Sequence, residues 1–435
     1  MIDVLVVGAG AGGVIAAWRA ATLGARVALF EKTPRIGTKI LISGGGKCNV
    51  AHDGPLEHLL SRFRPNERLF LRPSCYRFDN RQIMKLMTDC GLALYTRPDG
   101  RVFPSSGDAK DVVTILRGYL QDAGVEVYTE SPVTGFQIVE VGCPVVYVAA
   151  ATNPSAPKKP PRDGFGARVL LSRTLAEAEQ DAERWRGPNR VEAKAIVVAT
   201  GGSSYPKSGT TGDGWQWLRS AGHRVAKPTA ALAPIYMQEA AVSLAGVSAR
   251  DVVLKARGTR GVTATARGDL LFTHLGISGP AALDISRAVA EHLPEPVSLE
   301  VDLFPDVKLD DLRKTITDEL RSVGERVPAS LTSHFGLGAN SSDQKARNRL
   351  ADSAKALMLG GVRTVPLERG EVVAGGVALE EVDPKSMASR LVPGLFLCGE
   401  ILDLAGPVGG YNLQAAFATG YVAGESAARH ALDSS

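Results

Sequence analysis

The sequence predicts an α/β fold in which the two ends of the chain form one domain and the residues between them form a second. The first observation is a strand pattern at residues 2–7 that leads into a glycine turn, a helical pattern and a second strand at residues 26–30. The second is that helical and strand patterns continue to alternate after it. The third is the return of strand, glycine-rich loop and helix at residues 394–428. The opening order of strand, glycine turn, helix and strand is that of a Rossmann-type unit.

We infer the remaining helices and strands from the period of the hydrophobic residues and from the glycines and prolines that separate them. We expect helices at residues 81–90, 109–123 and 309–323, and strands at residues 125–128, 195–199 and 251–254. Residues 153–190 are rich in proline and charge, and their Ala/Glu-rich piece at residues 175–185 predicts a short exposed helix. We interpret this stretch as a surface excursion.

The domain boundaries are placed where these patterns change. Residues 1–203 and 371–435 are assigned to a discontinuous first domain, and residues 204–370 to an inserted domain on the substrate side. A chain of 435 residues is long enough for two or three domains. Its 44% hydrophobic residues and 47 glycines are typical of a globular α/β protein with many tight turns.

Charge and cysteine content narrow the classes of function. A net charge of +4 permits an anionic partner such as a nucleic acid without requiring one, and we interpret the cluster Arg62, Arg64 and Arg68 as a solvated face. The five cysteines form no C-x-x-C pair, so no disulfide framework and no metal site is predicted. No apolar run reaches the ~18 residues of a membrane helix. The strand at residue 2 leaves no room for a signal peptide, so we expect a cytoplasmic protein with no membrane contact.

The glycine turn has the spacing of a dinucleotide-binding motif. Gly8 permits the tight turn, Gly10 lets a diphosphate approach the backbone, and Gly13 allows the helix to pack closely on the strand. The N-terminus of that helix supplies N–H donors and a partial positive charge. Glu31 ends the second strand, where its carboxylate can accept hydrogen bonds from both ribose hydroxyls and would repel a 2′-phosphate. The motif therefore predicts binding of an adenosine that lacks this phosphate.

Three successive glycines, Gly44 to Gly46, lie in the segment from Lys39 to Asn49. Such a run has a conformational-entropy cost, and it is explained if backbone must lie against a flat ring or a phosphate. A plain flexible loop is the alternative. Cys48, in the same segment, is either a small core residue or a proton donor, and the absence of a visible base favours the core residue.

A second glycine-rich turn lies near the end of the chain. Gly399 and Glu400 end a strand, and Gly409 and Gly410 precede a helical pattern that starts at Tyr411. A helix N-terminus directed at the N1–C2=O edge of an isoalloxazine would stabilise a reduced flavin, and Glu400 suits a ribityl or ribose hydroxyl. An ordinary surface strand and helix would leave this turn unexplained. The turn is therefore a second candidate for contact with a cofactor.

Two further positions are candidates. Thr200 and Gly201 follow a strand and are expected to border the cofactor crevice. His274 is a candidate acid or substrate contact, as histidine often is, although a structural histidine is the favoured interpretation.

Together these motifs resemble the BaiN/RdsA-like (YhiN-type) family of NAD(P)/FAD-dependent oxidoreductases, which includes aminoacetone oxidase-like flavoproteins. The resemblance rests on residues 8–13, 39–49, 100–104, 199–206, 270–280, 375–377 and 393–414. It implies a Rossmann-type FAD-binding domain formed by both chain ends, with an insert that combines a small β-barrel and helices. The cofactor-binding residues expected from the motifs and the resemblance are Gly8, Gly10, Ala11, Gly13, Glu31, Lys32, Lys39, Ser43, Gly44, Gly45, Gly46, Cys48, Asn49, Thr200, Gly201, Gly399, Glu400, Gly409, Gly410, Tyr411, Asn412 and Leu413.

The chain also departs from the family pattern. Val50, Ala51 and His52 stand where a threonine and a second asparagine are usual, and Thr38 stands where arginine is common. These departures leave the contacts with substrate open at this part of the site.

Three hypotheses of function are open, the first two of which the resemblance implies. In the first, NAD(P)H reduces FAD and hydride passes from flavin N5 to an electron-poor C=C bond, such as that of a uridine in large-subunit ribosomal RNA, with Cys48 or His274 delivering the proton. In the second, the chain is an oxidase or reductase of a small molecule such as aminoacetone. In the third, it is a flavin-bound RNA-binding or assembly protein without turnover. The sequence does not indicate the oligomeric state.

Overall fold

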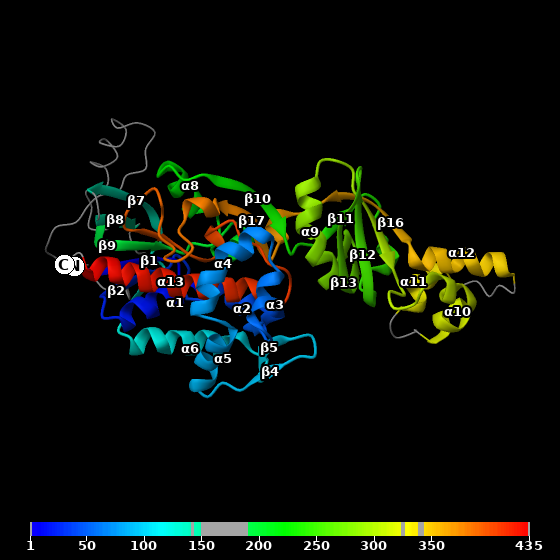
Figure 1. Ribbon diagram of the computed structural model, residues 1–435, viewed down its shortest axis with the longest axis horizontal. Helices are drawn as coiled ribbons and strands as arrows, with labels where there is room; N and C mark the ends of the chain where they lie inside the picture. The colour runs from blue at the N-terminus through cyan, green and yellow to red at the C-terminus, as the bar shows by residue number, and fades with distance from the viewer. Residues whose placement is uncertain (1, 141–142, 149–189, 323–326, 338–342, 434–435) are drawn as a thin grey trace. The chain divides into compact units, whose positions relative to one another are not determined.

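The computed structural model describes residues 2–140, 143–148, 190–322, 327–337 and 343–433, and it divides into two compact units (Figure 1). Unit 1 contains residues 1–228 and 375–435, and unit 2 contains residues 229–374. The chain crosses between the units inside β10 (Val225–Ala231) and returns inside β17 (Val372–Val377), two strands that pair with each other. The expected surface excursion and its helix lie outside the described residues.

The units divide at 228/229 and 374/375 rather than at the expected 203/204 and 370/371. For the first boundary the reason lies in α8 (Asp213–Ser220), whose Trp217 is buried against Phe136 of β7 (Val133–Glu140). The two ring centroids are 6.4 Å apart in an edge-on arrangement. Packing of this helix on a strand of the first sheet makes the residues before 228 part of unit 1.

The core of unit 1 is a seven-stranded sheet with the order β6-β2-β1-β9-β8-β7, in which β18 also pairs with β9. Its other strands are β1 (Ile2–Val7), β2 (Val27–Phe30), β6 (Glu126–Tyr128), β8 (Cys143–Val148), β9 (Arg190–Val198) and β18 (Leu395–Leu397). The pairs β1–β2, β1–β9, β2–β6 and β9–β18 are parallel, whereas β7 and β8 join in antiparallel pairs. Every residue of β1 is buried, as expected for a parallel strand covered on both faces. Because β18 comes from near the C-terminus, the predicted domain formed by both chain ends is confirmed.

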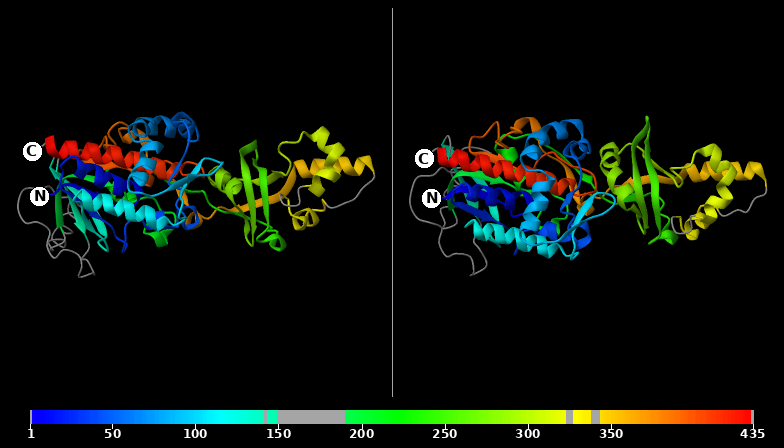
Figure 2. Two further views of the ribbon diagram at one scale, coloured as in Figure 1. Left: turned by 90° about the horizontal axis from the view of Figure 1, so that it is seen from below. Right: turned by 60° about the horizontal axis from the view of Figure 1, so that its bottom comes forward.

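Helices α1 (Ala11–Thr22) and α13 (Tyr411–Asp433) lie side by side in both views of Figure 2. Glycines of α13 allow the two backbones to touch. A Cβ atom on Gly420 would lie 2.3 Å from the carbonyl oxygen of Gly12, and one on Gly424 would lie 2.1 Å from that of Ala16. The helix after the first glycine turn is therefore fixed directly to the helix that ends the chain.

A buried carboxylate adds to this contact between chain ends. Glu425 of α13 is 4% exposed and forms ion pairs with Arg19, Arg77 and Arg429, at 3.4 Å in the case of Arg19. Three guanidinium groups thus converge on one acid, and removal of that acid leaves them without compensation.

Glu425→Gln is expected to lower the free energy of unfolding by about 2 kcal/mol or more, because an uncompensated charge in a partly buried cluster is costly. Urea unfolding measures the change. Glu57→Gln is the matched control, since Glu57 pairs with Arg72 on the surface and its loss should change stability by less than about 1 kcal/mol. Equal stabilities of the two variants would contradict this role of Glu425.

Unit 1 also contains a small antiparallel sheet with the order β3-β5-β4. Its strands are β3 (Ala51–His52), β4 (Leu94–Thr96) and β5 (Arg101–Pro104). The helices of this region are α2 (Thr38–Gly46), α3 (Leu56–Ser61), α4 (Pro65–Arg77), α5 (Asn80–Asp89) and α6 (Ala109–Asp122). The helices predicted at residues 81–90 and 109–123 are confirmed as α5 and α6.

Unit 2 contains the closed antiparallel barrel β11-β14-β13-β12-β15-β16, so the small barrel implied by the resemblance is confirmed. Its strands are β11 (Ile235–Met237), β12 (Ser248–Gly258), β13 (Gly261–Thr273), β14 (Gly276–Ser278), β15 (Ser298–Asp302) and β16 (Leu357–Thr364). Four helices accompany it, namely α9 (Pro280–His292), α10 (Leu309–Ser322), α11 (Ala329–His334) and α12 (Gln344–Lys355). Side chains such as Leu254, Phe272 and Leu299 fill the barrel core.

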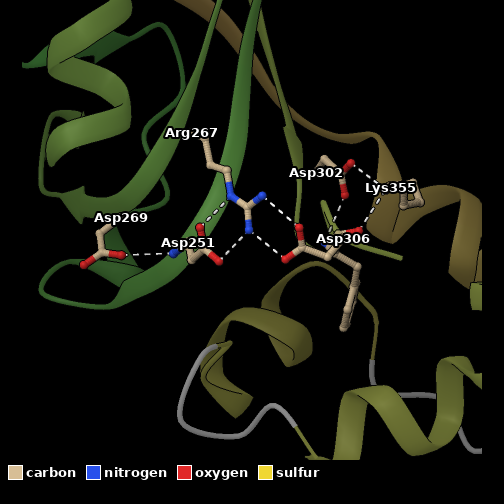
Figure 3. Close-up of polar contacts among 7 residues, drawn as sticks. Asp251, Arg267, Asp269, Asp302, Asp306 and Lys355 are labelled. Atoms are coloured by element: carbon tan, nitrogen blue, oxygen red, sulfur yellow. Dashed lines mark hydrogen bonds and ion pairs between the residues drawn. The ribbon is translucent and has the colours of Figure 1, made fainter. Parts of the chain in front are cut away.

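A set of ion pairs joins the barrel to the segment that leads into α10 (Figure 3). Arg267 donates to both carboxylate oxygens of Asp251 at 2.7 and 2.8 Å, and to both of Asp306 at 2.8 and 2.7 Å. These carboxylates raise the pKa of Arg267 above its usual value, Asp251 most strongly. Beside them Lys355 pairs with Asp302 at 2.6 Å. The planar guanidinium thus forms paired hydrogen bonds with both carboxylates, one on a barrel strand and one in the segment after the barrel.

The described residues contain neither a candidate membrane-crossing helix nor a candidate cluster of metal ligands. No helix in them combines the length and the apolar character that a membrane crossing requires. No group of three or more His, Cys, Asp or Glu side chains in the described ranges is placed to hold a metal ion.

Candidate flavin-binding site

The first glycine turn presents open backbone at the start of α1. Gly8 has φ +97°, and a Cβ atom there would lie 2.6 Å from the carbonyl oxygen of Ala199, while one on Gly13 would lie 1.8 Å from that of Gly8. Gly10 differs, because a Cβ atom on it would meet nothing within 4 Å. Gly10 is the N-cap of α1 and provides no side-chain cap. Space is thus open beside the N-cap of a helix whose first N–H groups have no side-chain cap, as an anion-binding helix N-terminus requires.

Glu31 is held beside this turn by two backbone hydrogen bonds. The N–H of Ala9 donates to Glu31 Oε2 and the N–H of Thr33 donates to Oε1, each at 2.8 Å. Each carboxylate oxygen keeps a further lone pair that can accept a hydroxyl. The predicted use of Glu31 for a ribose is therefore compatible with its contacts.

The triple-glycine segment is a helical turn followed by left-handed backbone, where the sequence analysis expected a side-chain-free loop. Helical backbone angles in α2 stop at Ser43, which has ψ 148°, and Gly44, Gly45 and Gly46 have φ of 57°, 68° and 84°. The N–H of Cys48 closes the turn by donating to the carbonyl oxygen of Ser43 at 3.0 Å. A Cβ atom on Gly44 would lie 3.2 Å from the Phe103 ring, whereas one on Gly45 would meet nothing within 4 Å. Gly44 and Gly45 are exposed, so the turn offers bare backbone on one side.

The glycine turn near the C-terminus packs against the strand that follows this segment. A Cβ atom on Gly410 would lie 2.7 Å from the carbonyl carbon of Ala51, and the carbonyl oxygen of Gly409 accepts a hydrogen bond from His52 Nδ1 at 3.1 Å. The His52 ring stacks on Tyr411 at 4.8 Å, and burial lowers the pKa of His52. The turn at residues 409–411 and the strand at residues 51–52 thus lie together within unit 1. His52 lies between them, and it is one of the residues that depart from the family pattern.

An ion pair connects three of the predicted segments. Lys39 Nζ donates to Glu400 Oε2 and to Ser204 Oγ, each at 2.7 Å. Lys39 and Glu400 are mostly buried, with side chains 25% and 17% exposed. Lys39 and Glu400 were both predicted site residues, but their pairing was not predicted, and Ser204 was not among the predicted residues although it lies in the motif at residues 199–206.

Two other predicted residues have structural partners. Lys32 Nζ lies 2.6 Å from Asp213 Oδ2 and 2.5 Å from Thr211 Oγ1, so its ammonium is directed at the loop before α8. Asn412 Oδ1 accepts from the N–H of Gly406 at 2.8 Å, and Nδ2 donates to the carbonyl oxygen of Gly406 at 2.9 Å. Asn412 therefore fixes the loop that carries the glycine pair. Ala11 and Leu413 lie in the first turns of α1 and α13.

Two buried polar atoms near this convergence have no hydrogen-bond partner among the described residues, namely Asn49 Oδ1 and Ser203 Oγ. Buried polar groups in proteins are nearly always hydrogen-bonded, so a polar ligand would supply the partners that these atoms lack. A dinucleotide with diphosphate, ribityl hydroxyls and a polar ring edge provides partners of this kind. The residues present therefore fit FAD. Ser203 was not predicted, and its only signal was its place after Gly201 and Gly202.

The two candidate proton donors lie in different units. Cys48 is fully buried at 0% exposure, and burial raises the pKa of its thiol to about 12. His274 is exposed in the turn between β13 and β14 of unit 2. A catalytic role for either residue stays a prediction.

Cys48 is expected to resist alkylation in the folded protein, because a thiol with this pKa remains protonated at neutral pH and the side chain is inaccessible. Exposed Cys90 is the internal reference and should react. Mass spectrometry after iodoacetamide treatment at pH 8 measures both sites. Modification of Cys48 as fast as Cys90 would show that its environment opens in solution.

A family model described as the HI0933-like protein Rossmann domain matches residues 2–154 and 167–426. The chain belongs to this family. Curated relatives agree along the whole length. A 3-dehydro-bile acid delta(4,6)-reductase of Clostridium scindens is 28% identical, covering 97% of this chain and 98% of the relative. A ribosomal RNA dihydrouridine synthase of Haemophilus influenzae is 27% identical, covering 98% of each.

Solved structures support the fold. A 3-ketosteroid delta1-dehydrogenase from Sterolibacterium denitrificans has a TM-score of 0.50 at 14% identity, covering 98% of this chain and 99% of the other. An Escherichia coli quinol fumarate reductase variant has a TM-score of 0.50 at 16% identity, covering 100% of this chain and 71% of the other. At these identities the likeness concerns the fold alone.

The family resemblance inferred from the motifs is thereby confirmed, and the chain is an FAD-dependent oxidoreductase of this family. The hypothesis of a flavin-bound protein without turnover is not retained.

Proposed function

We propose that this chain uses FAD and NAD(P)H to reduce an electron-poor C=C bond, and that its substrate is a uridine of large-subunit ribosomal RNA, which becomes dihydrouridine. The observation that carries the proposal is the convergence of the three glycine turns in unit 1, with unpartnered polar atoms of Asn49 and Ser203 near them. FAD, when bound, supplies hydride transfer at N5.

The chain's own residues bind and orient the cofactor. The N-terminus of α1 at Gly10 would hold the diphosphate, and Glu31 would accept from the adenosine ribose. The glycine turns at residues 44–46 and 409–410 would leave room for the ring system. The N-terminus of α13, which follows Gly410, would place a partial positive charge near the pyrimidine edge of the ring.

The chemistry shared by the relatives supports the choice of reaction. Dihydrouridine differs from uridine by two hydrogens added across a C=C bond conjugated to a carbonyl, and a 3-dehydro delta(4,6) steroid contains the same kind of conjugated bond. Both relatives cover nearly the full chain, so the same framework serves a large RNA and a small molecule. The common step is addition of hydride to one carbon of a polarised alkene and of a proton to the other.

Anaerobic titration with NADH and with NADPH, followed by mass spectrometry of nucleosides after incubation with ribosomal RNA, tests the proposal. We expect one of the two donors to bleach the flavin absorbance and dihydrouridine to appear. A flavin that neither donor reduces, or an unchanged RNA profile after complete reduction, would overturn it.

A second candidate is reduction of a small conjugated ketone, favoured by the match to the bile acid reductase over 97% of the chain. The same reduced protein distinguishes the two. Rapid reoxidation by a small enone together with no change in RNA would support this candidate. Rapid peroxide formation with an amine such as aminoacetone would instead support the oxidase hypothesis.

A further inference from the structure

An exposed row of cationic side chains lies on α4 and on the turn before it. Arg68 and Arg72 are one helical turn apart and exposed, and Tyr76, 56% exposed, lies a further turn along the same face. Arg62, also exposed, lies in the turn between α3 and α4. We call Arg62, Arg68, Arg72 and Tyr76 the arginine face. The acid that contacts it is Glu57, which pairs with Arg72 at 3.3 Å and accepts from the Tyr76 hydroxyl at 2.6 Å.

The arginine face begins at the wall of the flavin-binding site. Phe63, next to Arg62, is buried edge-on against the Tyr411 ring at 6.3 Å. A Cβ atom on Gly406 would lie 2.8 Å from the same phenylalanine ring. The charge of Arg62 also contributes to lowering the pKa of His52, after the larger effect of burial. All these residues belong to unit 1, so the distance between the arginine face and the flavin-binding site does not depend on where unit 2 lies.

The composition of the face fits the backbone of a single-stranded nucleic acid. Arginine forms paired hydrogen bonds to phosphate oxygens and is less strongly hydrated than lysine. An exposed tyrosine provides a surface on which a base can stack. Cations one turn apart along a helix can follow a chain of phosphates, whereas one contacting acid neutralises only part of their charge.

We propose that the arginine face binds the sugar-phosphate backbone of the RNA whose uridine enters the flavin-binding site. This inference rests on the proposed function and replaces the earlier interpretation of these arginines as a merely solvated surface. By this inference, residues outside the flavin-binding site favour a polyanionic substrate over a small molecule.

The test compares the holoprotein with two triple variants. Arg62→Gln/Arg68→Gln/Arg72→Gln removes three charges from the face, and Lys110→Gln/Arg117→Gln/Arg219→Gln removes three exposed charges from α6 and α8. Affinity for a 12-nucleotide oligouridylate is measured at several salt concentrations. The variant of the arginine face should bind the oligouridylate about tenfold more weakly than the unaltered protein. The slope of log K against log salt concentration should be less negative by about 2, because each of three lost phosphate contacts contributes about 0.7 to it. The control variant should change affinity by less than about twofold.

Activity on small molecules separates this inference from the proposed function. Reduction of the bound flavin by NAD(P)H and turnover of 2-cyclohexenone should be equal in all three proteins. Equal oligouridylate affinity and salt dependence in the two variants would overturn the arginine face alone. The inference also fails if the face variant loses binding to anionic phospholipid vesicles but keeps its RNA affinity. Absence of flavin reduction or of dihydrouridine in the unaltered protein would overturn the proposed function, whatever the binding results.

Discussion

Replacing Gly10 by alanine is expected to weaken FAD binding by about 10- to 100-fold while the apoprotein remains folded. A Cβ atom on Gly10 would meet no protein atom within 4 Å, and its φ of −76° is accessible to alanine. The new methyl group would instead occupy the space through which a diphosphate approaches the N-terminus of α1. Overpacking of this kind costs about 1–3 kcal/mol, which corresponds to the stated loss of affinity.

Two measurements on the same variant make this prediction specific. FAD affinity is measured by quenching of flavin fluorescence, and apoprotein stability by urea unfolding, which should change by no more than about 1 kcal/mol, the cost of a poorer N-cap. Gly13→Ala is the counterpart, because its Cβ atom would lie 1.8 Å from the carbonyl oxygen of Gly8 and should destabilise the apoprotein itself. Unchanged FAD affinity in Gly10→Ala would show that no diphosphate lies at this turn.

Gly424→Ala is expected to destabilise unit 1 by about 3 kcal/mol. The added Cβ atom would lie 2.1 Å from the carbonyl oxygen of Ala16, and the obstacle is backbone that cannot rotate away. Helices α1 and α13 would have to separate, which would also move the N-terminus of α1 relative to the glycine turn before α13. We therefore expect weaker FAD binding together with the loss of stability.

Gly118→Ala is the matched control for this substitution. Gly118 lies inside α6, and a Cβ atom there would meet nothing within 4 Å. Alanine has the higher helix propensity, so this control should be more stable than the parent by up to about 1 kcal/mol. Urea unfolding compares the two variants. If both were equally stable, the close approach of α1 and α13 would not exist in solution.

The sequence was most informative where a local pattern determines a local structure. The strand before Gly8, the helix after Gly10 and the acid at Glu31 could be placed because glycine spacing and hydrophobic period act over a few residues. The turn at Gly409 and Gly410 could be selected for a similar reason, since both glycines adopt positive φ values that other residues avoid.

Contacts between residues far apart in the chain could not be predicted from such local patterns. Lys39 and Glu400 lie 361 positions apart, and only the folded chain brings them together with Ser204. The convergence of Gly410 with Ala51 likewise depends on the packing of α13 against the first sheet. Barrel strand β13 contains glycine, alanine, threonine and arginine in place of a clear alternation, so the barrel followed from family resemblance alone. The unit boundary was displaced because Trp217 packs on the first sheet.

Backbone amide exchange with and without FAD tests most directly whether the separated turns hold one ligand. Protection should increase together at residues 8–13, 43–49 and 409–413, with the same dependence on FAD concentration at all three. Protection at residues 8–13 alone, with the other two turns unchanged at saturating FAD, would contradict the account.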